Sequence, residues 1–368
     1  MAVPFLDVTA QYRGLQSELE RALLDVARSG KYILGERGAA LEKELAAYVD
    51  VPYAVGCASG TDALILALRA AGVGPGHEVI TTAYSFFATA SSIALVGATP
   101  VFLDIDPRTY NLDCRHVEKK INVRTKAIIQ VHLYGQPAEM EPLLALSKEW
   151  GVRIIEDACQ SIGAEYKGKR ACAIGDIGCV SFYPTKNLSG MGDGGMLFTS
   201  DPEFFESLRI LREHGAKPRY IHKVIGYNSR LDELQAAVLL VKANRIEEWT
   251  AKRRAHAALY REQFEGSAVV PPVELPYVRH VYNQFVVRVK NRAKLMEHLK
   301  ARGIGCAIYY PVPLHLQECF CGLGYKKGDL PESERAAEET LALPIYPDLK
   351  PEQVAEVAKA VVDFHKKG

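Results

Sequence analysis

The sequence has 368 residues, and its 45 Lys and Arg against 44 Asp and Glu leave a formal net charge of +1. This balance gives no support to a protein that binds nucleic acid or an anionic membrane surface. The length corresponds to about two domains, and a hydrophobic content of 48% is ordinary for a globular chain. There is no apolar stretch long enough to cross a bilayer and no signal-peptide pattern in the first residues, so we expect a cytoplasmic protein.

Eight cysteines are scattered along the chain without a Cys-x-x-Cys pair. Cys319 and Cys321 flank one residue, which is poor spacing for a zinc site without a second pair. His214, His222 and His315 also lack the spacing of metal ligands. We therefore expect reduced thiols and no bound metal.

The first half of the chain is predicted to change from helices to alternating strands and helices. Leu15, Leu19 and Val26 fall on one face of a helix that stops at Gly30, and a second helix is predicted through 39–47. From about residue 55, short apolar runs predict strands at 78–81, 100–103, 127–131, 152–155, 179–182 and 196–198. Strands alternating with helices are typical of a mostly parallel sheet covered on both faces.

The remainder of the chain predicts a second, smaller unit. A long helical region is expected from about Leu231 to Phe264, and prolines from Pro271 onward then break the pattern. Beyond the break, strands are expected at 285–289 and 308–310, and helices at 295–299 and around Ala336 and Val354. The predicted fold class is α/β. A large domain over residues 1–265, with a helical start, holds a mostly parallel sheet between helices, and a small α+β domain covers residues 266–368.

The turn Ala58-Ser59-Gly60-Thr61 is the first segment that could carry chemistry, because small residues lead there into an apolar helix. Free backbone N–H groups and the positive end of the helix dipole make such a turn a good seat for phosphate. The alternative is a plain helix cap with Ser59 or Thr61 as the capping residue.

Asp157 is the second candidate, since it follows the apolar run Ile154-Ile155. In open α/β sheets, ligands sit at the carboxyl ends of the strands. A carboxylate at this edge could pair with a cationic ring nitrogen or a metal, and the alternative is a helix cap or a surface charge.

Lys186 is the third candidate, because it follows an apolar strand and precedes a glycine-rich turn at 190–195. Most lysines are solvated, but this setting suits a desolvated amine that forms a Schiff base. The pattern at 163–169 is not a phosphate-binding P-loop, because Arg170 stands where Ser or Thr would bind magnesium. A phosphate seat, an acid after a strand and a lysine in a turn are together what pyridoxal phosphate requires.

Ordered motifs over nearly the whole chain resemble the DegT/StrS family of sugar nucleotide aminotransferases, which are fold-type-I pyridoxal phosphate enzymes. The motifs lie at 5–7, 29–35, 59–64, 74–80, 156–158, 181–186, 192–195 and 227–231. The resemblance implies the fold-type-I architecture, pyridoxal 5'-phosphate as the cofactor and transamination as the reaction.

The resemblance also implies roles for four residues around the cofactor ring. Lys186 matches the family's Schiff-base lysine, and Asp157 matches the carboxylate that pairs with the pyridinium nitrogen. Gln160 stands where the family places a Gln or His near the cofactor hydroxyl. Phe86 matches the aromatic residue that stacks on the ring. Lys186 and Asp157 are therefore the expected catalytic residues.

The phosphate contacts implied by the resemblance come from two subunits. Gly60, Thr61 and Ser181 match contacts made within one chain, whereas Asn228 matches a ligand contributed by the neighbouring subunit. The resemblance therefore implies a homodimer with shared active sites.

The substrate implied by the resemblance is a nucleotide-linked keto sugar, with L-glutamate as the amino donor and an amino sugar nucleotide for surface polysaccharides as the product. Residues 168–172 and 219–230 look most like enzymes acting on UDP-linked 3-keto-2-acetamido-hexuronates. Arg230 would then pair with the uronate carboxylate, because arginine suits planar bidentate partners. A structural salt bridge is the alternative for Arg230.

Residues 282–317 look equally like the enzymes that act on dTDP-linked 3-keto-6-deoxyhexoses, so that substrate class, or its 4-keto counterpart, remains an alternative. Tyr309, Tyr310 and His315 lie in this region and are candidate sugar contacts. Many relatives carry His at the position of Tyr309. If that His contacts the sugar in those relatives, the sugar contacts of this chain differ from theirs.

Three further alternatives exist for the function. A keto-sugar dehydratase on the same scaffold would carry His in place of Lys186. A free cyclic ketone, such as an aminocyclitol precursor, could replace the sugar nucleotide. A non-catalytic regulatory descendant would be expected to have lost Lys186, Asp157 or the phosphate turn, and all three are intact.

Overall fold

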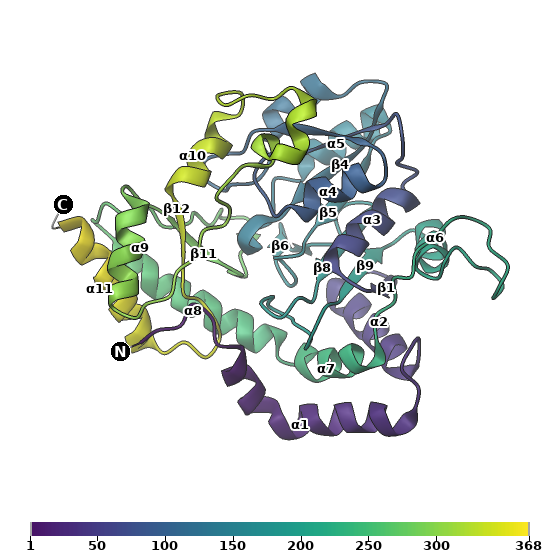
Figure 1. The fold of residues 1–368 in the computed structure, drawn as a ribbon, viewed down its shortest axis with the longest axis horizontal. Helices are drawn as coiled ribbons and strands as arrows, with labels where there is room; N and C mark the ends of the chain where they lie inside the picture. Colours follow the sequence, from purple (N-terminus) through teal and green to yellow (C-terminus); the bar gives the residue numbers. More distant parts are fainter. Residues whose placement is uncertain (1, 367–368) are drawn as a thin grey trace.

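A seven-stranded sheet forms the centre of the structure, a computed structural model that describes residues 2–366 (Figure 1). Its strands lie in the order β1 (Tyr53–Cys57), β9 (Gly195–Thr199), β8 (Ile177–Ser181), β5 (Arg153–Asp157), β4 (Thr125–Val131), β2 (Glu78–Thr82) and β3 (Thr99–Leu103). Strand β9 runs antiparallel to its neighbours β1 and β8, and the other paired strands are parallel. The prediction of an α/β fold with a mostly parallel sheet is confirmed.

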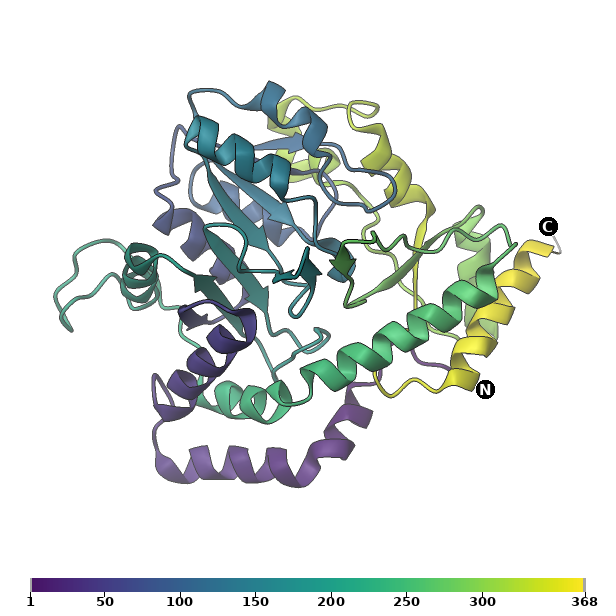
Figure 2. The ribbon, with the colours of Figure 1, turned by 180° about the vertical axis from the view of Figure 1, so that it is seen from behind.

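Helices cover both faces of this sheet, as the two opposite views show (Figures 1 and 2). Ile129 and Ile155 pack with the helices of one face, whereas the adjacent residues Ile128 and Ile154 pack against the other. Because both faces are buried, these strands read as continuous apolar runs in the sequence. The helices around the sheet are α2 (Glu36–Val49), α3 (Gly60–Ala70), α4 (Ala88–Leu95), α5 (Glu141–Trp150), α6 (Pro202–Arg212) and α7 (Glu233–Ala243).

Helix α1 (Val8–Ser29) lies outside the sheet and runs along α7 (Figure 2). Leu15 and Leu19 pack against Val238 and Trp249, so the predicted apolar face is the buried one. The helix ends at Gly30 in the left-handed conformation with a φ of 68°, which glycine adopts without strain.

The long helix predicted over 231–264 is two helices, α7 and α8 (Ile246–Phe264). The break falls at Asn244, whose side-chain amide donates to the Leu240 carbonyl at 3.2 Å. Such a side-chain bond competes with the backbone hydrogen bonds of a helix. The apolar pattern does not contain this information, so it predicted one helix.

The carboxyl-terminal region forms a smaller body around a second core. Strand β11 (Phe285–Arg288) pairs antiparallel with β12 (Thr340–Leu343), a strand that the sequence pattern did not predict. Residues from β11, β12 and the helices α8, α9 and α11 share one buried cluster. The helices that belong to this body are α9 (Arg292–Ala301), α10 (Pro331–Glu339) and α11 (Pro351–Lys366).

The prediction of a strand at 308–310 is wrong. Pairing with the sheet stops at Ala307, which bridges Ala342. The carbonyl of Tyr309 accepts hydrogen bonds from the hydroxyls of Tyr84 and Tyr134, and the N–H of Tyr310 donates to Tyr84. Tyrosine hydroxyls therefore bind the backbone groups that a strand partner would have bound.

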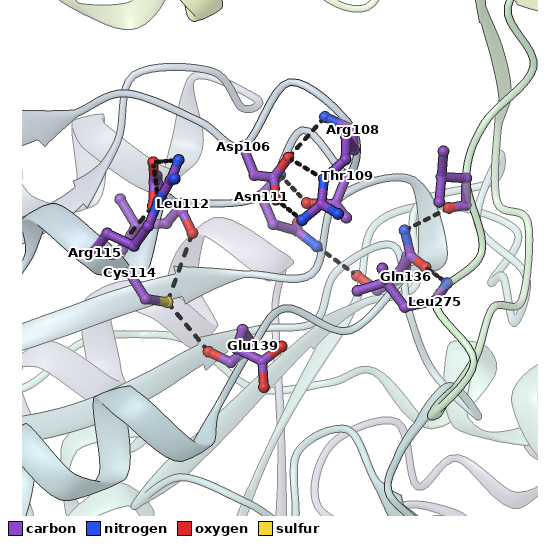
Figure 3. A network of polar contacts seen from close by, with 12 residues as sticks. Asp106, Arg108, Thr109, Asn111, Leu112, Cys114, Arg115, Gln136, Glu139 and Leu275 are labelled. Carbon is purple, nitrogen blue, oxygen red and sulfur yellow. Dashed lines mark hydrogen bonds and ion pairs between the residues drawn. The ribbon is translucent and has the colours of Figure 1, made fainter.

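Polar side chains link residues 106–139 to the segment at 273–275 (Figure 3). Asn111 donates to the carbonyl of Gln136 at 3.1 Å, and the Gln136 side chain donates to Val273 and accepts from the N–H of Leu275.

The segment around 163–169, which the sequence excluded as a P-loop, contains a hairpin. Its strands β6 (Glu165–Tyr166) and β7 (Lys169–Arg170) form a small sheet with β10 (Val278–Arg279).

The domain division at residue 265 stays a prediction. Segments from both sides of this boundary share a core. Val3 pairs with Ile304, and Tyr260 and Phe264 lie in the buried cluster of the carboxyl-terminal body.

None of the described helices combines the length and apolar character needed to span a bilayer. Short 3-10 turns lie at Cys114–His116, Glu118–Lys120, Leu133–Gly135, Leu314–Leu316 and Glu318–Leu323.

Candidate active site

The three segments predicted from the sequence meet at one edge of the sheet. Asp157 ends β5, Ser181 ends the adjacent strand β8, and Gly60 begins α3. A Cβ atom on Gly60 would lie 2.7 Å from the Cβ of Ser181 and 3.0 Å from the sulfur of Cys159. Lys186 lies in the turn that follows Ser181, so the phosphate turn, the acid and the lysine are neighbours.

The amino end of α3 has a side-chain cap and two backbone amides without a helical partner. Ser59 is the N-cap, and its hydroxyl accepts from the N–H of Asp62 at 3.0 Å. The amides of Gly60 and Thr61 precede that position, so they have no carbonyl partner within the helix. The cap predicted as an alternative is therefore present at Ser59, and it leaves these two amides free to bind phosphate beside Ser181.

Asp157 is a buried carboxylate with an exposed fraction of 6%. Its Oδ2 accepts from the Thr89 hydroxyl at 2.8 Å, and its Oδ1 accepts from the N–H of Cys159 at 3.3 Å. The Ser85 hydroxyl lies 2.8 Å from Thr89 Oγ1. Because Thr89 gives its proton to Asp157, Ser85 must donate to Thr89. The chain Ser85–Thr89–Asp157 delivers only donors to the carboxylate, which suits an ionised acid facing a cation.

Lys186 is partly buried beside these groups, and its backbone N–H donates to the Tyr183 carbonyl at 2.9 Å. Burial lowers the pKa of the Lys186 ammonium below 10.5, while Cys159 and Asp157 act in the opposite direction. A lowered pKa raises the neutral fraction of the amine, which is the form that attacks a carbonyl.

Gln160 and Tyr310 form the next side of the site. The Gln160 carbonyl oxygen accepts from the N–H of Tyr134 at 2.7 Å, and its amide donates to the Tyr310 hydroxyl at 3.0 Å. Burial raises the pKa of Tyr310 above its usual value, so its hydroxyl stays protonated. The ring of Phe86 lies 6.0 Å from that of Tyr310, and 54% of Phe86 is exposed, which leaves a ring face open for stacking.

Asn228 and Arg230 lie at the surface of the chain next to the phosphate turn. The Ser229 hydroxyl between them accepts from the N–H of Ala58 at 3.3 Å. Asn228 is exposed, and its side-chain oxygen accepts from Arg230 Nη2 at 2.5 Å. Both residues line a pocket with Ala58 and Gln235.

His315 is placed apart from the other predicted residues. Its side chain is buried, with Nε2 3.2 Å from Glu334 Oε1 and its ring 6.0 Å from that of Tyr325. The structure therefore gives His315 a partner in the interior. Tyr309 lies closer to the site, because the hydroxyl of the adjacent Tyr310 accepts from Gln160.

Sequence reasoning missed Ser85, Thr89, Cys159 and Tyr84. Ser85 and Thr89 follow β2, so polar residues just beyond the carboxyl end of a buried strand were an available signal. Cys159 stands two residues beyond Asp157, but its position against Gly60 depends on the pairing of β5 with β8.

The residues present fit pyridoxal phosphate group by group. Free amides and the Ser181 hydroxyl suit the phosphate, the carboxyl group of Asp157 suits the ring nitrogen, and the amide of Gln160 suits the ring hydroxyl. The amine of Lys186 suits the aldehyde. A Cβ at Gly60 would fill the space beside Ser181, so the close approach itself depends on glycine.

Comparisons with known proteins show which family the chain belongs to. The chain is 51% identical to a protein named pleiotropic regulatory protein from Geobacillus stearothermophilus, covering 100% of this chain and 99% of that one. It is 44% identical to the UDP-N-acetyl-3-dehydro-alpha-D-glucosamine 3-aminotransferase of Acidithiobacillus ferrooxidans, covering 98% and 97%. The crystal structure of S. venezuelae DesV superposes with a TM-score of 0.97 at 43% identity, covering 99% of both chains.

Solved structures related to this chain are described with pyridoxal phosphate or its amine form, pyridoxamine phosphate. A family model described as the DegT/DnrJ/EryC1/StrS aminotransferase family matches residues 14–362. The chain belongs to this family and is a pyridoxal-phosphate-dependent aminotransferase.

Proposed function

We propose that the protein transfers the amino group of L-glutamate to a UDP-linked 2-acetamido-3-keto-hexuronate. The product is an amino sugar nucleotide for surface polysaccharides, and the reaction takes place in the cytoplasm. The observation that carries this proposal is the state of Arg230. Its Nε is buried without a hydrogen-bond partner, and its Nη2 donates to the amide oxygen of Asn228 rather than to a carboxylate. A carboxylate on the sugar would supply the planar partner that arginine prefers.

The name of the Acidithiobacillus relative supports a UDP-linked sugar with a ketone at carbon 3. The dTDP-linked 3-keto- or 4-keto-6-deoxyhexoses remain the second candidate, because residues 282–317 resemble those enzymes. A deoxyhexose carries no carboxylate, so Arg230 separates the two substrate classes.

The arrangement of side chains supports transamination at Lys186. When bound, pyridoxal phosphate supplies an aldehyde that captures amines and a ring that takes up electrons from the substrate carbon. Asp157 would hold a proton on the ring nitrogen by its opposite charge. As a neutral amine, Lys186 Nζ would take the proton from Cα of glutamate.

A homodimer is part of the proposal. The loop that follows α6 projects from the rest of the chain (Figures 1 and 2), and Tyr220, Ile221 and Ile225 on it are 77%, 59% and 87% exposed. Exposed apolar side chains gathered in one segment are typical of an interface. This loop leads directly to Asn228, so a second copy docked on it would place Asn228 near the partner's phosphate seat.

The experiment is a half reaction followed by absorbance. The purified protein should be yellow and should bleach with L-glutamate. It should regain colour with the UDP-linked 3-keto-hexuronate faster than with the UDP-linked 3-keto sugar that lacks the carboxylate, with dTDP-linked deoxyhexoses or with free cyclitol ketones. Faster recovery with a dTDP sugar would replace the proposed substrate by the second candidate. Lys186→Ala should abolish both colour and turnover.

A non-catalytic regulatory role is the alternative that the name of the Geobacillus relative suggests. Lys186, Asp157 and the phosphate turn are all in place, which supports catalysis. A protein whose absorbance changes neither with L-glutamate nor with any keto sugar would favour the regulatory role.

A further inference from the structure

The hydroxyl of Tyr84 connects the sheet to the carboxyl-terminal body. Tyr84 follows β2 and is fully buried. Its hydroxyl donates to the Tyr309 carbonyl at 2.7 Å, accepts from the N–H of Tyr310 at 2.9 Å and lies 2.8 Å from the Thr340 hydroxyl. One phenol oxygen therefore satisfies both backbone groups of a single peptide that belongs to no strand.

The same peptide reaches the site from its other side. The Tyr310 hydroxyl accepts from the amide of Gln160, and the Gln160 oxygen accepts from the N–H of Tyr134. The Tyr134 hydroxyl in turn donates to the Tyr309 carbonyl. These bonds form a closed set in which the position of Gln160 depends on where the Tyr309–Tyr310 peptide is held.

We propose that Tyr84 is a positioning residue, whose hydroxyl fixes the Tyr309–Tyr310 peptide so that the Tyr310 hydroxyl stays on Gln160. This inference rests on the proposed function, in which Gln160 and Tyr310 line the site for cofactor and sugar. Tyr84 itself is two residues before Phe86, the expected stacking residue, whose ring lies 6.0 Å from that of Tyr310. Loss of its hydroxyl would leave the N–H of Tyr310 without its partner while the cofactor's phosphate seat stays intact.

Tyr84→Phe tests the proposal, with Tyr260→Phe as the matched control. Tyr260 is also fully buried, and its hydroxyl also donates to a backbone carbonyl, that of Pro344 at 3.0 Å, inside the carboxyl-terminal body. We expect Tyr84→Phe to change the visible circular dichroism of the bound cofactor. We also expect it to raise the KM for the keto sugar nucleotide about tenfold with a smaller effect on kcat, which corresponds to one lost hydrogen bond. Tyr260→Phe should change neither property.

Tyr310→Phe provides a second route to the same result, because it removes the other end of the connection while Tyr84 keeps its bonds. It should reproduce the change in circular dichroism, and the double variant should show less than the sum of the two KM effects. Cofactor circular dichroism of Tyr84→Phe equal to that of wild type or of Tyr260→Phe would overturn the proposal. Additive KM effects would overturn it as well.

The two readouts separate this inference from the proposed function. Circular dichroism of the bound cofactor requires no sugar substrate. If wild type aminates none of the keto sugar nucleotides, the proposed substrate fails, while the comparison of Tyr84→Phe with Tyr260→Phe still decides whether Tyr84 positions the site.

Discussion

The hydroxyl of Thr89 donates a hydrogen bond of 2.8 Å to Asp157 Oδ2, and this bond joins the first turn of α4 to the end of β5. Thr89 is itself oriented by Ser85, so its proton points at the carboxylate. The donor favours the ionised form of Asp157, which is the form that keeps a ring nitrogen cationic.

Thr89→Val removes this donor, and we expect turnover to fall roughly tenfold, in line with the loss of a hydrogen bond to a charged group. The pH dependence of the cofactor absorbance should shift as well, because Asp157 would hold the ring proton less firmly. Spectrophotometric titration of the holoenzyme measures this shift.

Thr250→Val is the matched control for Thr89→Val. Thr250 is also buried, with an exposed fraction of 1%, but its hydroxyl has no hydrogen-bond partner. The same chemical change should therefore leave both turnover and the titration curve unaltered. A titration curve of Thr89→Val that overlays the wild-type curve would argue against the role given to Thr89.

The edge of the sheet that carries the chemistry was predictable from local sequence, because Asp157 and Lys186 follow strands whose apolar runs reflect burial on both faces. Thr89 was not predicted, since its bond to Asp157 spans 68 residues and depends on the order of strands in the sheet. Propensity and pattern describe each strand, but which strands become neighbours is a property of the whole fold.

The error at Tyr309-Tyr310 has a related cause. An aromatic, apolar run favours a strand, but the hydroxyl of Tyr84, 225 residues away from Tyr309, binds its backbone instead. Strand β1 was also missed, because this short strand with a glycine at position 56 pairs only with the distant β9. In each case a contact between remote segments decided the local structure.

Gly60→Ala should weaken the binding of pyridoxal phosphate at least about tenfold, because a methyl group at this position would lie 2.7 Å from the Cβ of Ser181. The amino end of α3 would have to move away from β8, and the two amides that face the phosphate would move with it. Titration of the apoprotein with cofactor, followed by absorbance, gives the dissociation constant.

Gly14→Ala is the corresponding control, since nothing lies within 4 Å of a Cβ atom at that position in α1. It should leave cofactor affinity unchanged and stabilise the helix by about 0.5–1 kcal/mol. Equal affinities for Gly60→Ala and wild type would show that the phosphate does not depend on the close approach of Gly60 to Ser181.

Lys242 should make the stability of the protein depend on pH in the alkaline range. Its ammonium donates to the Ser189 carbonyl at 2.8 Å, and burial lowers the pKa of Lys242 to about 8. In the unfolded chain the pKa of lysine is about 10.4, so between these values the unfolded state binds more protons. The contribution of Lys242 to the free energy of unfolding therefore rises as pH increases from about 8 to 10.4 and is flat below that window.

Lys242→Met lacks this titration, so the difference between wild type and variant isolates it from other groups. We expect urea unfolding to show a wild-type free energy that gains on the variant by roughly 3 kcal/mol at most across the window. Two curves that stay parallel from pH 7.5 to 10 would mean that Lys242 is not desolvated.

Arg230 distinguishes the two substrate classes. If its guanidinium binds a uronate carboxylate, Arg230→Gln should raise the KM for the UDP-linked 3-keto-hexuronate about 100-fold. It should leave the KM nearly unchanged for the UDP-linked 3-keto sugar that lacks the carboxylate. Arg230→Lys should recover only part of the loss, because an ammonium cannot form the bidentate pair. Arg245→Gln is the control, since Arg245 is a half-buried arginine whose ion pairs, at 3.8 and 3.9 Å, lie outside the site. Its loss should leave the KM for both sugars unchanged. An equal rise in KM for both sugars in Arg230→Gln would assign the guanidinium to the nucleotide phosphates or to the local fold, because only a contact with the carboxylate can tell the two sugars apart.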